Sequence, residues 1–306
     1  MWQSIVNFFW PVIAFFLSIY TCVASWFGVV PGVDIMKNYK YNTASSAQVM
    51  DIYLPKNANG NAILFIHGGG WTGGDKNSYA DACEFLAQQG YACATMNYRL
   101  FEPNNPAQNL TFWDMTDDIA AAISKLDTEM KNKGITPKKL AINGASAGGH
   151  LTLLYAYARR STSAIPIAFI APDVGPSDFT DPAYLESPRA PATFYTLTSF
   201  ILKQNVTADN RQSFTQELLA LSPIQYIDAG APPTLMRYGG KDELVPASNG
   251  TILAEKLNAA GVRNDLFIYE NSGHGLENIK NAAGTDYAVN QAHSAKLTEY
   301  LEAYFD

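Results

Sequence analysis

The chain has 306 residues, a length that suits one large α/β domain with an insertion or a terminal extension. Only 16% of the residues are charged, the formal net charge is −7 and no basic cluster is present, so we expect no nucleic-acid partner and little electrostatic attraction to anionic membranes. The cysteines, Cys22, Cys83 and Cys93, lack the spacing of a metal site or a disulfide framework, although a Cys83–Cys93 bridge stays open. We therefore expect neither a metal nor a cofactor.

The first 33 residues carry no charged side chain, and residues 8–30 form an apolar stretch long enough to span a bilayer. Residues 1–33 are thus predicted to be a hydrophobic N-terminal helical segment. It is a signal peptide, a membrane anchor, or a lid-like helix packed on the rest of the protein. The first two interpretations predict an exported or membrane-associated protein with membrane contact through residues 1–33. The third predicts a cytoplasmic protein.

A stripe of small or polar residues runs along this segment at alternating steps of three and four, as expected on one side of a helix. Such a stripe suits close helix contact in a membrane and also a helix with a thin wet face, so it leaves the interpretations open. Its members are Ser4, Asn7, Pro11, Ala14, Ser18, Thr21 and Ser25.

Strands are predicted at residues 39–41 and 49–54, the second with the alternation of a half-buried antiparallel strand. A buried strand at residues 62–66 then runs into His67 and the glycines at 68–70. Successive glycines let backbone N–H groups turn toward one point, as an acyl-transfer enzyme needs in order to hold a negatively charged oxygen. The alternative is a glycine-rich surface turn.

Helices are predicted at residues 77–89 and 113–133, with a buried strand at 92–97 between them. Strands and helices alternate from residue 62 to residue 160. This alternation predicts a parallel sheet that is covered by helices on both faces.

A short apolar strand at residues 140–142 leads into Gly144-Ala145-Ser146-Ala147-Gly148, and a helix is predicted directly after it. A serine on such a strand-to-helix turn sits in a strained elbow, which lifts its hydroxyl above the sheet edge and points the helix N-terminus at it. The small flanking residues allow close backbone contact. Ser146 is therefore the candidate nucleophile, with a serine-capped helix as the alternative.

After a strand at residues 165–170, the chain makes a long excursion over residues 172–222, with a helix predicted at 192–204. A loop of this length in a compact domain is usually functional, so we expect a cap-like insertion that closes a substrate pocket. A satellite helix with its own small core is the alternative. The aromatic residues expected to line the pocket are Trp71, Phe179, Tyr184, Phe194 and Phe200.

Two later strand ends carry an acid and a base. Asp242 follows a strand that ends in Gly239-Gly240, and His274 lies in the polar loop after the next strand. A serine beside a base that a carboxylate orients is the minimum for nucleophilic catalysis. The rivals are Glu243, Asp265 and Asp173 for the acid and His150 for the base, with His150 expected to be structural. His67 is expected to shape the glycine loop through hydrogen bonds, and His293 is expected at the surface or in a satellite core.

The chain resembles the α/β-hydrolases, and within them the hormone-sensitive-lipase-like carboxylesterases and the bacterial feruloyl- or acetyl-esterase-like branch. The likeness covers about residues 38–306. It rests on residues 67–71, 74–76, 97–100 and 144–151, on Asp242 with Val245-Pro246, and on His274. The resemblance implies a mostly parallel, doubly covered sheet in a catalytic domain at residues 34–306, with the cap-like insertion at 172–222. The family's nucleophile, acid and base fall on Ser146, Asp242 and His274, and its oxyanion donors on the N–H groups of Gly69, Gly70 and Ala147.

The resulting hypothesis is a serine carboxylic-ester hydrolase that acts on a small-molecule ester, which is a short-chain, an aryl or a lipid ester. A membrane-associated acyltransferase with the same triad and a non-catalytic binding member of the fold are the alternatives. The natural ester, its acyl length and the oligomeric state are left open by the sequence.

Overall fold

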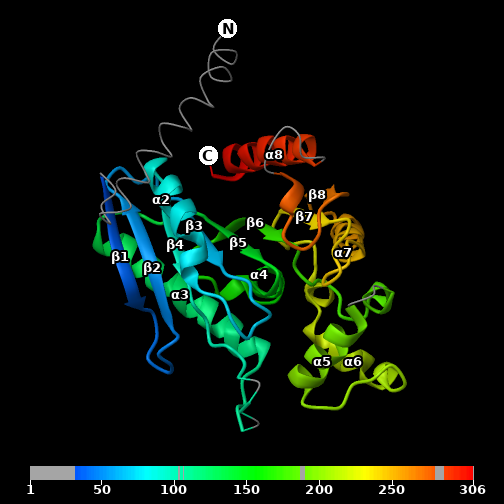
Figure 1. Cartoon of the computed structure of the whole chain (residues 1–306). Helices are drawn as coiled ribbons and strands as arrows, with labels where there is room; N and C mark the ends of the chain where they lie inside the picture. The colour runs from blue at the N-terminus through cyan, green and yellow to red at the C-terminus, as the bar shows by residue number, and fades with distance from the viewer. Residues whose placement is uncertain (1–31, 103, 106, 187–189, 280–285, 306) are drawn as a thin grey trace.

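The computed structural model describes residues 32–102, 104–105, 107–186, 190–279 and 286–305 (Figure 1). Its centre is a sheet of eight strands in the order β1-β2-β4-β3-β5-β6-β7-β8. The β1–β2 and β2–β4 pairs are antiparallel, and all other neighbours are parallel. The strands are β1 (Val33–Lys40), β2 (Val49–Pro55), β3 (Ala62–Ile66), β4 (Ala92–Met96), β5 (Leu140–Ala145), β6 (Ile167–Asp173), β7 (Thr234–Gly239) and β8 (Asn264–Tyr269).

Side chains alternate between the two faces along the central strand β3. Ile63 and Phe65 belong to the core under α2 and α8, whereas Leu64 and Ile66 belong to the core under α3, α4 and α7. Both faces are therefore covered, and the prediction of a mostly parallel, doubly covered sheet is confirmed (Figure 1). These helices are α2 (Ala80–Gln88), α3 (Phe112–Asn132), α4 (Ala147–Ala158), α7 (Ser248–Ala259) and α8 (Tyr287–Phe305).

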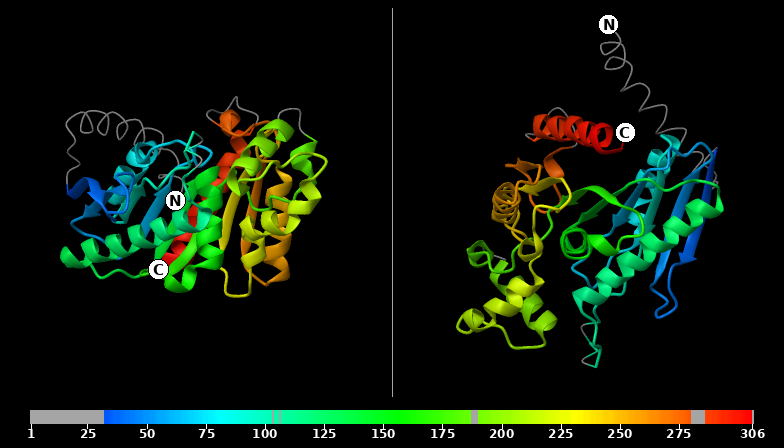
Figure 2. Two further views of the ribbon diagram at one scale, coloured as in Figure 1. Left: turned by 90° about the horizontal axis from the view of Figure 1, so that it is seen from below. Right: turned by 180° about the vertical axis from the view of Figure 1, so that it is seen from behind.

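The excursion after β6 packs beside α7, on the side of the molecule away from β1 and β2 (Figure 2). Its residues Phe179, Tyr184 and Leu218 join the same hydrophobic core as α3 and α4. The insertion is therefore not a satellite with a separate core. Its elements are η3 (Pro182–Leu185), α5 (Ala190–Leu202), η4 (Arg211–Phe214), α6 (Thr215–Leu221) and η5 (Pro223–Tyr226).

Several strand boundaries differ from the sequence prediction, and β5, predicted at residues 140–142, continues to Ala145. β1 begins at Val33, six residues before the predicted strand at 39–41. β6 extends to Asp173, so Pro172, which was expected to open the excursion, lies in the sheet. Gly144 pairs with Pro172 and Ala145 with Asp173, which carries the sheet up to the nucleophile turn.

The hydrophobic helical segment is predicted at residues 1–33, of which residues 1–31 lie outside the described residues, whereas Val33 begins β1. Among the described helices, none combines the length and the apolar character needed to cross a bilayer. Cys83 and Cys93 are both buried, and both are free thiols, so the open Cys83–Cys93 bridge is not formed.

Candidate active site

Ser146 occupies the turn between β5 and α4, with the unusual backbone angles φ 54° and ψ −119°. A positive φ is strained for a residue with a Cβ atom and persists only when its surroundings hold it. The Ser146 N–H donates to the carbonyl oxygen of Asp173 at 2.9 Å. A Cβ atom on Gly148 would lie 2.1 Å from the carbonyl oxygen of Ile66, so only glycine allows α4 to approach β3 this closely.

The structure brings the predicted nucleophile, base and acid into one hydrogen-bonded chain. His274 Nε2 lies 2.9 Å from Ser146 Oγ, and His274 Nδ1 lies 2.6 Å from Asp242 Oδ2. The three residues follow β5, β7 and β8, whose carboxyl ends meet at the same edge of the sheet. With Nδ1–H donating to Asp242, Nε2 is the acceptor for the Ser146 hydroxyl, as a general base requires.

The Asp242 carboxylate is fully buried and is held on both oxygens. While Oδ2 faces His274, Oδ1 accepts hydrogen bonds from the N–H groups of Leu244 at 2.8 Å and Val245 at 2.9 Å. These bonds satisfy a buried charge and fix its direction. Two rival acids are occupied elsewhere, since Asp173 pairs with Arg237 and Asp265 accepts from the Tyr300 hydroxyl.

The glycine loop after β3 faces the same cavity as Ser146 and His274. Gly69 and Gly70 have φ angles of 116° and 60°, and a Cβ atom on Gly69 would lie 2.3 Å from the Gly73 carbonyl oxygen. Ala147 is the first residue of α4, so its N–H belongs to the helical turn that has no intrahelical acceptor. The predicted oxyanion donors therefore lie on the two backbone segments that flank the nucleophile.

Side chains outside the cavity support this loop. His67 stacks on Tyr98 with ring centroids 4.5 Å apart, and its Nδ1 contacts the Gly68 carbonyl oxygen at 2.7 Å. Burial lowers the pKa of His67, so the ring is neutral at pH 7 and suits a structural contact rather than proton transfer. This agrees with a role in shaping the loop.

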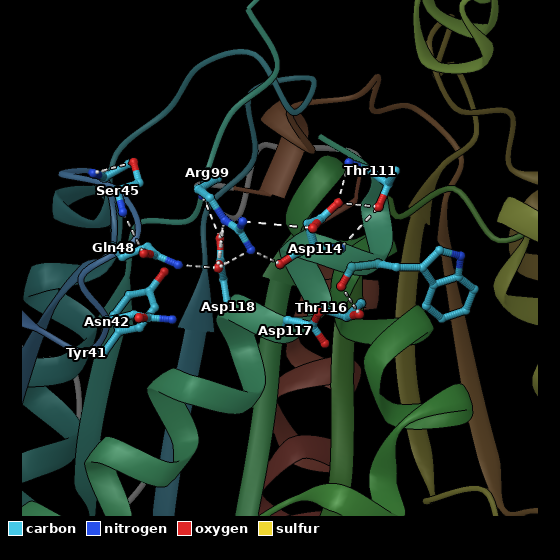
Figure 3. Close-up of polar contacts among 12 residues, drawn as sticks. Tyr41, Asn42, Ser45, Gln48, Arg99, Thr111, Asp114, Thr116, Asp117 and Asp118 are labelled. Atoms are coloured by element: carbon cyan, nitrogen blue, oxygen red, sulfur yellow. Dashed lines mark hydrogen bonds and ion pairs between the residues drawn. The ribbon is translucent and has the colours of Figure 1, made fainter. Parts of the chain in front are cut away.

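The segment after β4 is fixed by a buried carboxylate (Figure 3). Asp118 accepts from the Arg99 N–H at 2.9 Å, from Arg99 Nε at 3.0 Å and from Gln48 Nε2 at 2.6 Å. Two residues further on, the Phe101 N–H donates to the Trp71 carbonyl oxygen at 2.8 Å. Arg99 therefore helps to position the segment after β4 that contacts the end of the glycine loop, a role that its sequence motif did not reveal.

A cavity of about 320 Å³ opens beside Ser146. Its walls are mostly apolar, and four of the five predicted pocket residues contribute to them: Trp71, Phe179, Tyr184 and Phe194. Trp71 is almost completely buried and packs against Phe112 and Phe179, so it forms a fixed wall. The remaining lining residues are Gly69, Gly70, Pro176, Leu197, Leu244, Val245 and His274, together with Ser146 itself.

Phe200 does not line this cavity, so its predicted place in the pocket is wrong. It packs edge-on against Phe101 with ring centroids 5.4 Å apart and lines a separate cavity of about 260 Å³. Phe194 and Leu197 share one face of α5 because they lie three residues apart. Phe200 lies six residues from Phe194, about 240° around the helix, and therefore faces another side.

The other two histidines are structural. His150 Nε2 lies 2.9 Å from the Leu221 carbonyl oxygen, and complete burial lowers the pKa of His150 to about 4. Burial, with the nearby Arg237 charge, also lowers the pKa of His293 to about 4. His293 packs edge-on against Phe267, so of the two predicted locations it has the buried one. Neither side chain contacts Ser146.

Comparison with known proteins finds sequences related to this chain. A model of the BD-FAE family matches residues 50–257. The curated relative "Probable carboxylic ester hydrolase LipM" of Mycobacterium tuberculosis is 32% identical over 205 residues, which cover 64% of this chain and 44% of LipM. The chain thus spans less than half the length of this relative.

Two solved structures share the fold. A truncated carbohydrate esterase from gut microbiota gives a TM-score of 0.65 at 20% identity and covers 85% of this chain and 96% of its own. The butyrate-bound esterase Est2 of the planctomycete Thermogutta terrifontis gives a TM-score of 0.62 at 22% identity. The match covers 90% of this chain and 95% of the Est2 chain. These likenesses establish the architecture.

Proposed function

Because the chain belongs to the BD-FAE family, within the α/β-hydrolases, we propose that it hydrolyses carboxylic esters through Ser146, His274 and Asp242. The observation that carries the proposal is the continuous chain of hydrogen bonds from Ser146 Oγ through His274 to Asp242, at the wall of an apolar cavity. A complete chain of this kind argues against a non-catalytic binding protein.

In the first half of the reaction, Ser146 Oγ attacks the ester carbonyl carbon while His274 Nε2 takes the hydroxyl proton. The carbon–oxygen bond to the alcohol then breaks, and the alcohol leaves with the proton that His274 returns. Water repeats these steps on the acyl-enzyme and releases the carboxylic acid. Asp242 holds His274 in the tautomer that accepts the proton and stabilises its transient cation.

The tetrahedral intermediate carries a negative oxygen that must be stabilised. We assign this role to the N–H groups of Gly69, Gly70 and Ala147, which belong to the two backbone segments beside Ser146. Each fixed donor of this kind contributes roughly 3 kcal/mol to stabilising the transition state.

The cavity favours a small acyl group. About 320 Å³ is at the lower end of ligand pockets, and its aromatic and aliphatic walls offer few polar partners. A short aliphatic or an aryl acyl group fits this space, whereas a long lipid chain would have to extend past the half-exposed Leu244 into solvent. The structural relative Est2, which was solved with butyrate bound, is consistent with a small acyl group.

The experiment that tests this function is hydrolysis of p-nitrophenyl esters with two to sixteen acyl carbons, and of methyl ferulate, by the wild-type chain and by Ser146→Ala. We expect turnover of the short or aryl esters, and a loss of about 10³-fold or more in kcat for Ser146→Ala with an unchanged melting temperature. Retained turnover in the folded variant would reject the assignment. Ester product that forms only when an alcohol is added would instead favour an acyltransferase.

A further inference from the structure

Positive φ angles recur at residues with side chains around the active site, among them Trp71 with φ 59°, and two of these residues are connected through the backbone. Ser146 has φ 54°, and Val174, directly after β6, has φ 44°. A positive φ is a pronounced outlier for a β-branched residue such as valine. Strain of this kind persists only where the surrounding contacts fix the backbone, and it gathers at functional sites.

Asp173 connects the two strained residues. Its carbonyl oxygen accepts the Ser146 N–H at 2.9 Å, and its peptide bond leads directly into Val174. The Val174 N–H in turn donates to the carbonyl oxygen of Arg237 at 2.8 Å. Ala145, Asp173 and Arg237 lie in register across β5, β6 and β7, at the row of the sheet directly before the nucleophile.

The side chains of Asp173 and Arg237 form a second link in the same place. Arg237 Nε lies 2.5 Å from Asp173 Oδ1, and its terminal nitrogen lies 2.7 Å from Oδ2. The Asp173 side chain is 11% exposed and the Arg237 side chain 23%, so water competes little for this pair. A paired fork of this geometry fixes direction as well as distance, which a single lysine ammonium cannot do.

We propose that Asp173 and Arg237 are positioning residues for the nucleophile. Their side-chain pair and the Arg237 carbonyl oxygen fix the backbone of Asp173, and the Asp173 carbonyl oxygen in turn holds the Ser146 N–H. This inference rests on the proposed ester hydrolysis. Neither side chain lines the cavity, so substrate binding does not depend on them. A misplaced Ser146 hydroxyl would slow acylation, because nucleophilic attack is sensitive to displacements of about 1 Å.

The test is a double-mutant cycle of Arg237→Lys, Asp173→Asn and the double variant, assayed on the best p-nitrophenyl ester. We expect each single variant to lower kcat about tenfold or more while KM stays within about twofold. The double variant should lose about as much as either single one, because the residues act as a unit. Arg160→Lys is the matched control, since Arg160 pairs with both oxygens of Asp228 beyond the far end of α4 and should leave kcat unchanged.

Melting temperatures separate positioning from simple structural support. A lowered melting temperature with kcat within about twofold of wild type, assayed well below melting, would overturn the proposal. So would a change confined to KM, strictly additive losses in the cycle, or failure of both single variants to fold. Absence of turnover in the wild-type chain would reject the ester-hydrolase function itself, and this inference with it. A loss of kcat that is limited to the Asp173 and Arg237 variants supports both the ester-hydrolase function and the positioning role.

Discussion

Ser146 and His274 are separated by 128 positions in the chain, yet their side chains lie 2.9 Å apart. Each residue follows the carboxyl end of a strand, and the parallel sheet brings those ends to the same edge. The precision of the contact comes from individual backbone bonds, such as the two N–H groups that hold the remaining oxygen of Asp242. The side-chain types therefore determine which groups can react, and these backbone hydrogen bonds determine how the groups are oriented.

The lowered pKa of the single residue His150 predicts that the free energy of unfolding depends on pH. Its pKa is about 4 in the folded chain against 6.5 for an unperturbed histidine, because burial disfavours the charged ring. The unfolded chain therefore binds more protons than the folded chain below pH 6.5. The contribution of His150 to the free energy of unfolding is fully present above pH 6.5 and is lost as the pH falls toward 4, by up to about 3 kcal/mol.

The measurement is urea unfolding of wild type and His150→Gln from pH 4 to pH 7. The free energy of unfolding of wild type relative to the variant should fall as the pH decreases through this range. His293, which has a similarly lowered pKa, is present in both chains, so its titration cancels. A difference that stays constant with pH would contradict a neutral, buried His150.

Among the elements, the junction between the insertion and α7 is centred on the buried amide of Asn249, and Ser248 adds a hydrogen bond to Asp181. Asn249 Oδ1 accepts from the N–H groups of Ser177 at 2.9 Å and Asp178 at 3.1 Å, while its Nδ2 donates to Asp181 Oδ2 at 2.8 Å. The Tyr184 hydroxyl, from the cavity wall, also donates to Oδ1 at 3.3 Å. Asn249 therefore couples α7, which follows the acid loop, to the wall that contacts the acyl group.

Asn249→Ala should lower the free energy of unfolding by about 2 kcal/mol or more, because it leaves several buried polar groups without partners. It should also raise KM, since the wall formed by Tyr184 loses its anchor. Asn258→Ala on the exposed side of the same helix is the matched control and should be nearly neutral. Urea unfolding measures the free energy of unfolding of both variants, and steady-state kinetics measure their KM. Equal effects of the two substitutions would refute the coupling of α7 to the cavity wall through Asn249.

For the whole molecule, the architecture could be predicted from the sequence. Apolar runs of strand length, glycines at the right strand ends and the chain order Ser146, Asp242, His274 were sufficient, because parallel strands leave few alternative arrangements. The three candidate catalytic side chains then follow from the topology. The hydrogen bonds among them could only be observed in the structure.

The residues that sequence reasoning missed act across long distances in the chain. Asp118, Arg237 and Asn249 carry no local signal, because each is defined by partners on other elements. Phe200 was misplaced because composition gives the apolar character of a helix but not which of its faces meets the cavity. The boundary of β6 was missed because Pro172 resembles the start of a loop, although it pairs with Gly144 within the sheet.

The central claim is that Ser146 is a nucleophile activated by its neighbours. The most direct measurement is the intact mass and peptide map of the chain after reaction with diethyl p-nitrophenyl phosphate, in which a serine oxygen–phosphorus bond forms as p-nitrophenolate leaves. We predict one diethylphosphoryl group per chain, located on Ser146, and no labelling of the folded variants Ser146→Ala and His274→Ala. Labelling at another residue, or equal labelling of Ser146→Ala, would contradict the account.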